Sequence, residues 1–242
     1  MPVTKRLQLI DLLRGVAILL MVLFHGAYDL TFYHLAQFDF YNDPFWLNAR
    51  TFIVSLFLSL VGISLVLAST HSINWKRYGK RMAWLVASAA LITLTSYFMF
   101  PGRTIVFGIL HFIVLASLLG LLFTAHPWIS LVTGIVLILV GTLYSHPLFN
   151  HPSLHWIGLM TFRPATEDYV PLLPWMGVVL LGISIGHLLE KTTAGKKLLC
   201  TYCPFGFARL LALAGRHSLL IYMLHQPVLL ALLWPVAGFP GL

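Results

Sequence analysis

The sequence predicts an all-α integral membrane protein, a bundle of about seven membrane-spanning helices forming a single domain over residues 1–242. The first observation is composition, because 59% of the residues are hydrophobic and only 9% are charged. Soluble domains carry about 25% charged residues, and a chain of this length could not bury so much apolar surface in water. The second observation is that apolar runs of about twenty residues recur along the chain. The third is that most basic residues lie in the short connections between these runs.

The expected spans follow one another with short connections. They run over residues 7–32, 47–69, 82–100, 104–123, 127–144, 170–189 and 216–234, the last with a helical approach from residue 205. The first run contains Asp11 and Arg14, and no small-residue cleavage site follows it. We therefore expect a retained first span and not a cleaved signal peptide.

The basic residues predict the orientation of the bundle. Lys5 and Arg6 precede the first span, and further Lys and Arg residues lie between the second and third spans and between the sixth and last. If the spans alternate, all of these fall on one side, and the opposite loops are poorer in Lys and Arg. The positive-inside rule predicts a cytoplasmic N-terminus, with outer loops over residues 33–46, 101–103 and 145–169.

Charge and cysteine content argue against other classes of protein. The net charge of +8 comes largely from loop residues, which indicates membrane topology and not binding to nucleic acid. Cys200 and Cys203 form a C-x-x-C without nearby histidines, so we expect reduced thiols and not a zinc site. The outer-loop histidines fit no metal-binding motif either, and no metal cofactor is expected. They are His146, His151 and His155.

Four ionisable residues form a stripe on one face of the first span. They are Asp11, Arg14, His25 and Asp29. At about 100° per residue they fall within about 60° of arc, whereas Leu19 and Leu23 lie on the opposite faces. A charged side chain within a span costs about 2.5–3.5 kcal/mol, so such residues normally face a bundle interior. The stripe therefore predicts a polar cavity along this helix.

The residues of the stripe lie at two different depths along the first span. Arg14 lies near the cytoplasmic end, and His25 lies about 16 Å further along the helix. Asp29 follows His25 by one turn, a spacing that could hold one imidazole nitrogen and orient the other. This arrangement suits a donor that brings phosphates to Arg14 and a reactive carbonyl to His25. A structural interpretation stays open, in which Asp11 and Arg14 form a helix-start ion pair and the outer residues clamp two helices together.

Several segments reproduce motifs in one order along the chain. Asp11-Leu12-Leu13-Arg14-Gly15 followed by His25 matches the R-x10-H pattern of transmembrane acyltransferases. Residues 57–65 resemble a second-span motif, and Arg77-x-x-Lys80-Arg81 resembles the basic motif after it. The later segments are FGILHF at 107–112, DYVPLLPW at 168–175, and GRHSL leading to His225 and Gln226 at 215–226. Together they resemble the heparan-α-glucosaminide N-acetyltransferase catalytic family, in a short bacterial form.

The resemblance implies an acyltransferase of a bacterial inner membrane, with a multi-pass topology and, by analogy with such families, a homodimer. Its donor would be cytoplasmic acyl-CoA, most simply acetyl-CoA, and its acceptor an extracytoplasmic sugar amine or hydroxyl or another small molecule. The donor-binding residues expected on this basis are Asp11, Arg14, Arg77, Lys80, Arg81 and His111. The sequence does not separate direct transfer from a covalent acyl-enzyme.

The catalytic and acceptor-side assignments have open alternatives. His25, with Asp29 beside it, is the favoured base, but His34 is the counterpart of the histidine that the resemblance places just beyond the first span. Asp168, Tyr169 and Trp175 could contact the acceptor or simply begin a span with an interfacial aromatic residue. His225 could line the site beside Pro227. His111 could line the cavity or hydrogen-bond a neighbouring backbone group.

A transporter or flippase is the alternative class, because intramembrane Asp, Arg and His residues also form proton relays. A proton-coupled carrier of small solutes would use the same stripe. The sequence shows neither an inverted repeat nor a pair of broken spans, which such carriers often contain. Acyltransferase activity is therefore the favoured interpretation.

Overall fold

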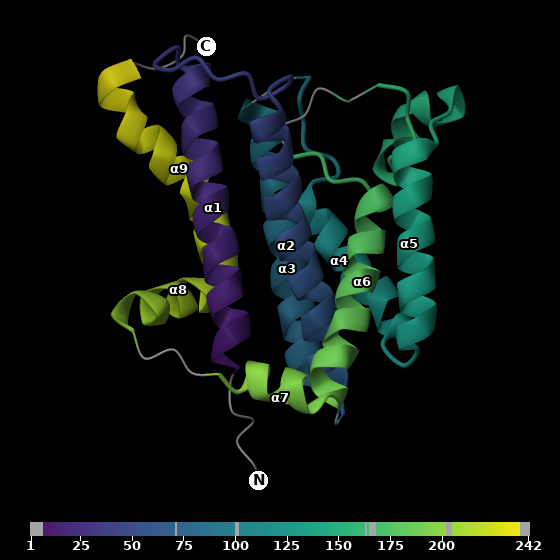
Figure 1. Cartoon of the computed structure of the whole chain (residues 1–242). Coiled ribbons are helices and arrows are strands. Elements are labelled where there is room, and N and C mark those ends of the chain that lie inside the picture. The colour runs from purple at the N-terminus through teal and green to yellow at the C-terminus, as the bar shows by residue number, and fades with distance from the viewer. Residues whose placement is uncertain are drawn as a thin grey trace. The chain divides into compact units, whose positions relative to one another are not determined.

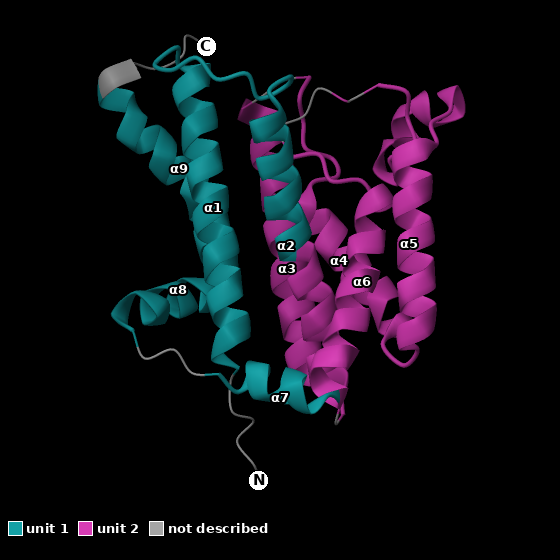
Figure 2. Ribbon diagram, in the orientation of Figure 1, with its two compact units in different colours: residues 1–57, 192–242 teal, residues 58–191 magenta. Residues whose placement is uncertain are grey.

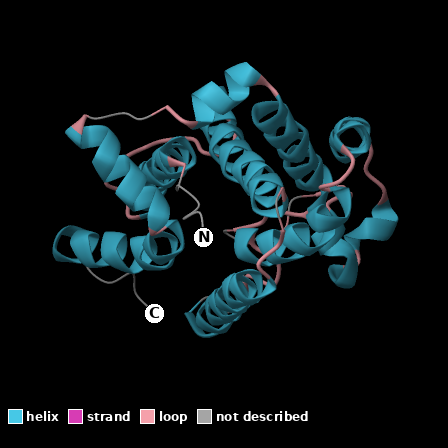
Figure 3. Ribbon diagram, turned by 90° about the horizontal axis from the view of Figure 1, so that it is seen from below, coloured by secondary structure: helices cyan, strands magenta, loops and turns pink. Residues whose placement is uncertain are grey.

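The structure is a computed structural model and describes residues 7–70, 72–99, 102–162, 164, 168–201 and 205–237. Within these residues every regular element is a helix (Figures 1 and 3). The helices are α1 Gln8–Phe32, α2 Pro44–Ser69, α3 Trp75–Met99, α4 Ile109–Phe123, α5 Pro127–Leu143, α6 Leu172–Lys191, α7 Thr193–Leu199, α8 Gly206–Arg216 and α9 Ser218–Ala237, with the 3-10 helices η1 Pro147–Asn150 and η2 Pro152–Ile157 between α5 and α6.

The prediction of an all-α membrane bundle is confirmed. Among the described residues, five helices are long and apolar enough to cross a membrane, namely α1, α2, α3, α6 and α9. The apolar helices α4 and α5 are shorter, and they coincide with the fourth and fifth expected spans. Lys5, Arg6, Arg163 and Glu167, which bear on the expected orientation, lie outside the described residues.

Two helix boundaries differ from the predicted ones by five residues or more. α3 begins at Trp75 and not near residue 82, because the side chain of Asn74 accepts the backbone N–H of Arg77 at 3.0 Å and caps the helix. The basic motif therefore lies on the first turns of α3 and not in a loop. α4 begins at Ile109, five residues after the predicted start at Thr104, where Gly108 has an extended backbone.

The described chain divides into two compact units (Figure 2). Unit 1 comprises residues 1–57 and 192–242, so α1 and the first part of α2 belong with α7, α8 and α9. Its core is formed by Ile18, Met21 and Ile53, with the side chains of Phe57 and Ile221 packed against them. Unit 1 therefore joins the two ends of the sequence.

Within unit 1, α8 crosses α1 so closely that the backbones of the two helices are in contact. A Cβ atom added to Gly215 would collide with the backbone oxygen of Asp11, and one added to Gly15 would collide with that of Leu211. Both positions need glycine, because only a residue without a side chain permits so close an approach. α8 and α9 are separate helices, since His217 lies between them and donates its N–H to Leu213 and Ala214.

Unit 2 comprises residues 58–191 and contains the rest of α2 with α3, α4, α5 and α6. α6 packs against both α4 and α5. Its core includes Leu58, Phe112, Leu180 and Ile183, all of which are fully or almost fully buried. Unit 2 is thus a helical bundle with its own apolar interior.

Candidate functional site

The ionisable stripe on α1 faces protein, as its helical periodicity predicts. Asp11 and Asp29 are both buried, with 3% of each residue exposed. On the opposite faces, Leu19 and Leu23 are 40% and 60% exposed. Burying two carboxylates in an apolar helix requires polar partners, because an uncompensated buried charge is costly. These partners come from α8 and α9, at the other end of the sequence.

Two arginines surround the carboxylate of Asp11. The Nε of Arg216 donates to Asp11 Oδ2 at 3.0 Å, and the guanidinium of Arg14 lies 3.8 Å from Oδ1. The side chains of Arg216 and Arg14 are 40% and 27% exposed, whereas that of Asp11 is almost completely buried. The two guanidinium groups and the one carboxylate together carry a net charge of +1, which suits an anionic ligand. The sequence motif contained Arg216, but its place beside Asp11 was not predicted.

Two imidazole rings meet at the other end of the stripe. The rings of His25 on α1 and His225 on α9 have centroids 4.8 Å apart and an interplanar angle of 75°. His25 Nδ1 lies 2.9 Å from the Met21 carbonyl, and His225 Nδ1 lies 2.6 Å from the Tyr222 carbonyl. Because a carbonyl oxygen only accepts, each Nδ1 carries its proton in the neutral ring and each Nε2 is an acceptor. The chemistry of a base is therefore available at Nε2 of both rings.

Asp29 connects α1 to α9, and its predicted contact with His25 stays a prediction. Its Oδ1 accepts the side-chain N–H of Gln226 at 2.8 Å, whereas the Met21 carbonyl holds His25 Nδ1. Among the residues that the structure describes, His225 Nε2 and Gln226 Oε1 are buried without a hydrogen-bond partner. Two buried acceptors without donors favour a ligand that supplies O–H or N–H groups.

Arg50 is a further cation near this end of the stripe. It lies on the part of α2 that belongs to unit 1, and its charge acts on the His25 imidazole. Its influence on His25 was not predicted from the sequence. A positive charge whose field reaches a base can stabilise negative charge that develops on a reacting oxygen.

His34, the rival base, lies just beyond the end of α1. It is exposed, its backbone has a φ of 60°, and its N–H bonds the Thr31 carbonyl. This left-handed conformation commonly ends helices, and it is usually adopted by Gly or Asn. The structure therefore gives His34 a structural position at the helix end, whereas His25 contacts a second histidine.

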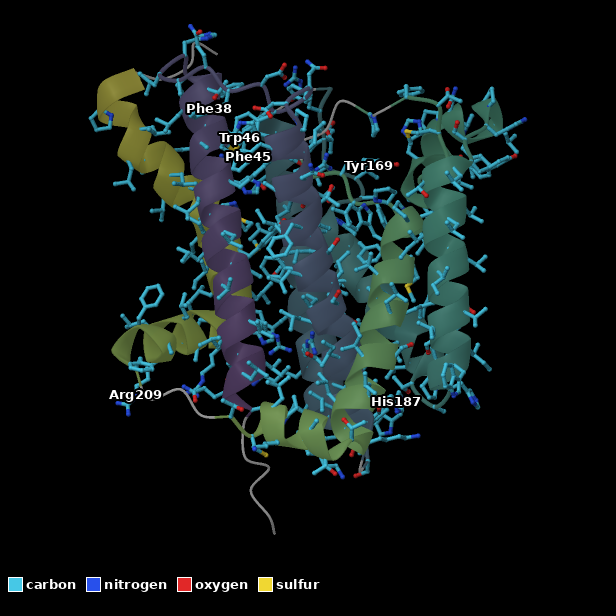
Figure 4. The ribbon with its side chains drawn as sticks, in the orientation of Figure 1. Phe38, Phe45, Trp46, Tyr169, His187 and Arg209 are labelled. Atoms are coloured by element: carbon cyan, nitrogen blue, oxygen red, sulfur yellow. The ribbon has the colours of Figure 1, made fainter. Side chains whose placement is uncertain are left out.

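The loop after α1 forms an aromatic cluster that the sequence analysis did not predict. The cluster consists of Phe24, Phe38, Phe40 and Trp46, and Figure 4 labels Phe38 and Trp46 near the end of α1. Phe40 is buried beneath Trp46, with ring centroids 4.4 Å apart. Phe24 also contacts the His25 ring, at 6.0 Å. The cluster thus packs directly beside the histidine pair.

An aspartate turn shapes this loop. The side chain of Asn42 and the backbone N–H groups of Asn42 and Tyr41 all donate to the carboxylate of Asp39. These hydrogen bonds lower the pKa of Asp39, because they favour its ionised form. The turn places Phe38 and Phe40 on either side of Asp39 within the cluster.

Two of the motif segments meet in unit 2, at the start of α4. Asp168 Oδ2 accepts the N–H of Ile109 at 3.2 Å, and His111 Nδ1 accepts the N–H of Gly108 at 3.3 Å. His111 Nε2 lies 3.1 Å from the Thr93 hydroxyl. His111 therefore bonds a neighbouring backbone group, one of the two roles expected for it, and Asp168 caps the helix. A role of either residue in binding donor or acceptor stays a prediction.

The remaining predicted residues also lie in unit 2. Tyr169 donates its hydroxyl to the His155 carbonyl at 2.7 Å, and burial raises the pKa of Tyr169 to about 12. Figure 4 labels Tyr169 just before α6, and Trp175 is half-buried in the first turns of that helix. The basic residues Arg77, Lys80 and Arg81 are exposed on the first turns of α3. Their predicted contact with the donor stays a prediction.

Among the described residues, no group of three or more His, Cys, Asp or Glu side chains is arranged to hold a metal ion. In the segment between α5 and α6, His151 bonds Ser153 and His155 bonds the Asn150 carbonyl. Cys200 is an exposed free thiol, and Cys203 lies outside the described residues.

Comparison with known proteins identifies a family. Residues 6–227 match the family described as heparan-alpha-glucosaminide N-acetyltransferase, catalytic. No curated protein and no solved structure matches the chain. The match covers α1, with its ionisable stripe, and extends to the histidine and glutamine of α9. The chain therefore belongs to the heparan-α-glucosaminide N-acetyltransferase catalytic family, whose members are transmembrane acetyltransferases.

Proposed function

We propose that the protein transfers an acetyl group from cytoplasmic acetyl-CoA to an amine or hydroxyl on the opposite side of its membrane. The observation that carries this proposal is the histidine pair of unit 1. In a chain of an acetyltransferase family, His25 and His225 present two Nε2 acceptors beside the Asp29–Gln226 hydrogen bond. Such a group is suited to take a proton from a nucleophile.

The donor would be anchored at the other end of α1. Coenzyme A carries phosphate groups, and the guanidinium groups of Arg14 and Arg216 are oriented by Asp11 for bidentate contact with such oxygens. His25 lies eleven residues beyond Arg14, or about 16 Å along the helix. The pantetheine arm of the donor is long, thin and neutral, so it can extend along the stripe between the two ends. We further predict donor contacts for Arg77, Lys80 and Arg81.

The proposed reaction uses the histidine tautomers described above, in which Nδ1 carries the proton and Nε2 is free to act as a base. His25 Nε2 removes the proton from the acceptor as its nitrogen or oxygen attacks the thioester carbonyl. The tetrahedral intermediate carries a negative oxygen, and the positive charge of Arg50 favours it. The carbon–sulfur bond then breaks, and the thiolate of coenzyme A leaves with the proton that His25 had taken. His225 Nε2 would accept a second hydrogen bond from the acceptor and hold it in place.

A covalent route uses the same residues. His25 could first take the acetyl group on Nε2 and then pass it to the acceptor, with coenzyme A released before the acceptor reacts. Single-turnover kinetics separate the routes, because only the covalent one releases coenzyme A in a burst without acceptor.

Acetyl-CoA binding tests the donor anchor without requiring the acceptor to be known. A ligand at a hundredfold excess over its Kd stabilises the folded protein by about 2.7 kcal/mol. We expect acetyl-CoA to raise the unfolding temperature of the detergent-purified protein, and Arg216→Ala to lower the affinity about tenfold or more, since one charge-assisted contact is worth about 1.5–3 kcal/mol. Arg209→Ala is the matched control, because Arg209 lies on the same helix and is exposed.

The unfolding temperatures of the variants distinguish the donor anchor from its alternatives. Stabilisation that weakens in Arg216→Ala and Arg14→Ala but persists in Arg209→Ala supports the donor anchor. Equal stabilisation in all variants contradicts it. If no acyl-CoA stabilises the wild type while a small solute drives proton flux into vesicles, the protein is a transporter and the proposal fails.

A further inference from the structure

α8 is a short helix fixed across a membrane-spanning one. It has 11 residues, a length of about 16 Å, which is too short to cross the hydrocarbon core. Figure 1 shows it running across α1 and not alongside it. The contacts of Gly215 with the Asp11 backbone and of Gly15 with the Leu211 backbone fix this crossing, because neither helix can roll without a collision.

The crossing point sets the depth of α8. Asp11 and Gly15 lie three and seven residues beyond the start of α1 at Gln8, or about 5 to 11 Å along the helix. α1 is one of the helices long and apolar enough to span a membrane. A helix held across it at this depth lies in the plane of the bilayer, near the boundary between headgroups and acyl chains.

The side chains of α8 divide into three faces. Ala208, Ala212 and Gly215 are buried and lie within about 60° of arc, on the side toward α1. A second, apolar arc is exposed, with Phe207, Leu210 and Leu213 at 67%, 65% and 51% exposed. The third face is basic, because Arg209 and Arg216 lie within about 20° of each other. An exposed apolar arc beside a basic edge is typical of helices that lie in a membrane interface.

The charged residues around α8 indicate which lipid headgroups it would contact. α7, which contacts α1 at the same end of unit 1, exposes Lys196 and Lys197. No described residue of α7 or α8 is acidic, and the carboxylate of Asp11 is already paired with Arg216. Arg209 projects from α8 away from α1 (Figure 4). A basic surface without carboxylates attracts negatively charged headgroups, and its affinity rises with each Lys or Arg near the membrane.

We infer that α8 is an interfacial membrane helix, with Phe207, Leu210 and Leu213 in the acyl chains and Arg209 on the phosphates of anionic lipid headgroups. The partner is the anionic bilayer surface on the side of the basic loops.

Spin labelling measures the depth of α8 in the bilayer and so tests its interfacial position. The background variant Cys200→Ser/Cys203→Ser receives one cysteine at a time, at Leu210→Cys, Leu213→Cys or Arg209→Cys, and each is spin-labelled in nanodiscs. We expect labels at positions 210 and 213 to contact oxygen in the acyl region, and the label at 209 to lie at headgroup depth. Ser153→Cys, in the exposed loop between α5 and α6, gives the aqueous reference.

The depth readings need neither donor nor turnover, so they stand or fall separately from the proposed function. Labels at 210 and 213 that are as accessible to an aqueous nickel reagent as the label at 153 would overturn the inference. Labels that neither oxygen nor nickel reaches would overturn it too, because they would show a protein partner or a second copy on this face.

Lipid charge is tested with the unlabelled protein. We expect phosphatidylglycerol added to phosphatidylcholine nanodiscs to stabilise the wild type, and Arg209→Gln to bind phosphatidylglycerol about fivefold more weakly by native mass spectrometry. The variant should unfold at the wild-type temperature in pure phosphatidylcholine, which shows that its fold is intact. Equal retention of phosphatidylglycerol by wild type and variant would contradict the role of Arg209.

Discussion

Gly215→Ala should destabilise the protein through a single added methyl group. The Cβ atom would collide with the backbone oxygen of Asp11, and the backbone of α1 cannot move aside as a flexible side chain could. Overpacking of this kind costs about 1–3 kcal/mol, and replacing Gly by Ala within a helix returns about 1 kcal/mol of helix propensity. Because the obstacle is backbone, we expect an overpacking cost near the upper end of its range, which leaves a net loss of about 1–2 kcal/mol in the free energy of unfolding.

The assay is thermal unfolding in one detergent, with Gly79→Ala as the control. Gly79 lies within α3, where an added Cβ meets no atom within 4 Å, so the same change should be neutral or stabilising there. For a chain of this size, 1 kcal/mol corresponds to about 2–4 °C, so Gly215→Ala should unfold about 2–8 °C below the wild type. If both variants unfold at the same temperature, the close crossing of α1 and α8 is wrong.

Two further predictions concern the loops. Tyr169→Phe removes the hydrogen bond to His155, worth about 0.5–1.5 kcal/mol. The pKa of Tyr169 is raised to about 12 in the folded protein, so the protonated hydroxyl stabilises the fold fully below the unfolded pKa near 10, and this stabilisation is lost as the pH rises through 12. Unfolding followed from pH 9 to 12 should therefore show that the free energy of unfolding falls more steeply with pH in the wild type than in Tyr169→Phe. His34→Asn should keep the end of α1 intact, since Asn adopts positive φ readily, and acetyl transfer should persist; its loss at an unchanged unfolding temperature would favour His34 as the base.

Much of the fold could be predicted from the sequence because the signals are local. Apolar runs of span length gave the membrane helices, and a period of 3.6 residues placed Asp11 and Asp29 on the buried face of α1. The start of α3 was misjudged because its first turns are basic and fall outside the apolar run. Only the cap by Asn74 marks that start.

The partners of the stripe could not be predicted, because they lie far away in the sequence. Arg216 is 205 residues from Asp11, and Gln226 is 197 residues from Asp29. No periodicity links such positions. The same holds for the His25–His225 contact, which depends on how α9 returns to α1, and for Asp168, which caps α4 from 59 residues away. Local spacing suggested Asp29 as the partner of His25, and it gave no sign that the Met21 carbonyl would lie beside His25 Nδ1.

In the proposed reaction, His25 is the group that moves the proton during acetyl transfer. The direct test measures coenzyme A release from acetyl-CoA with a thiol reagent, using glucosamine as the probe acceptor and comparing the wild type with His25→Ala. We predict release by the wild type and a rate about 10²–10⁴-fold lower in His25→Ala, with acetyl-CoA still stabilising the variant. Release at the wild-type rate by a folded His25→Ala protein would contradict the central claim.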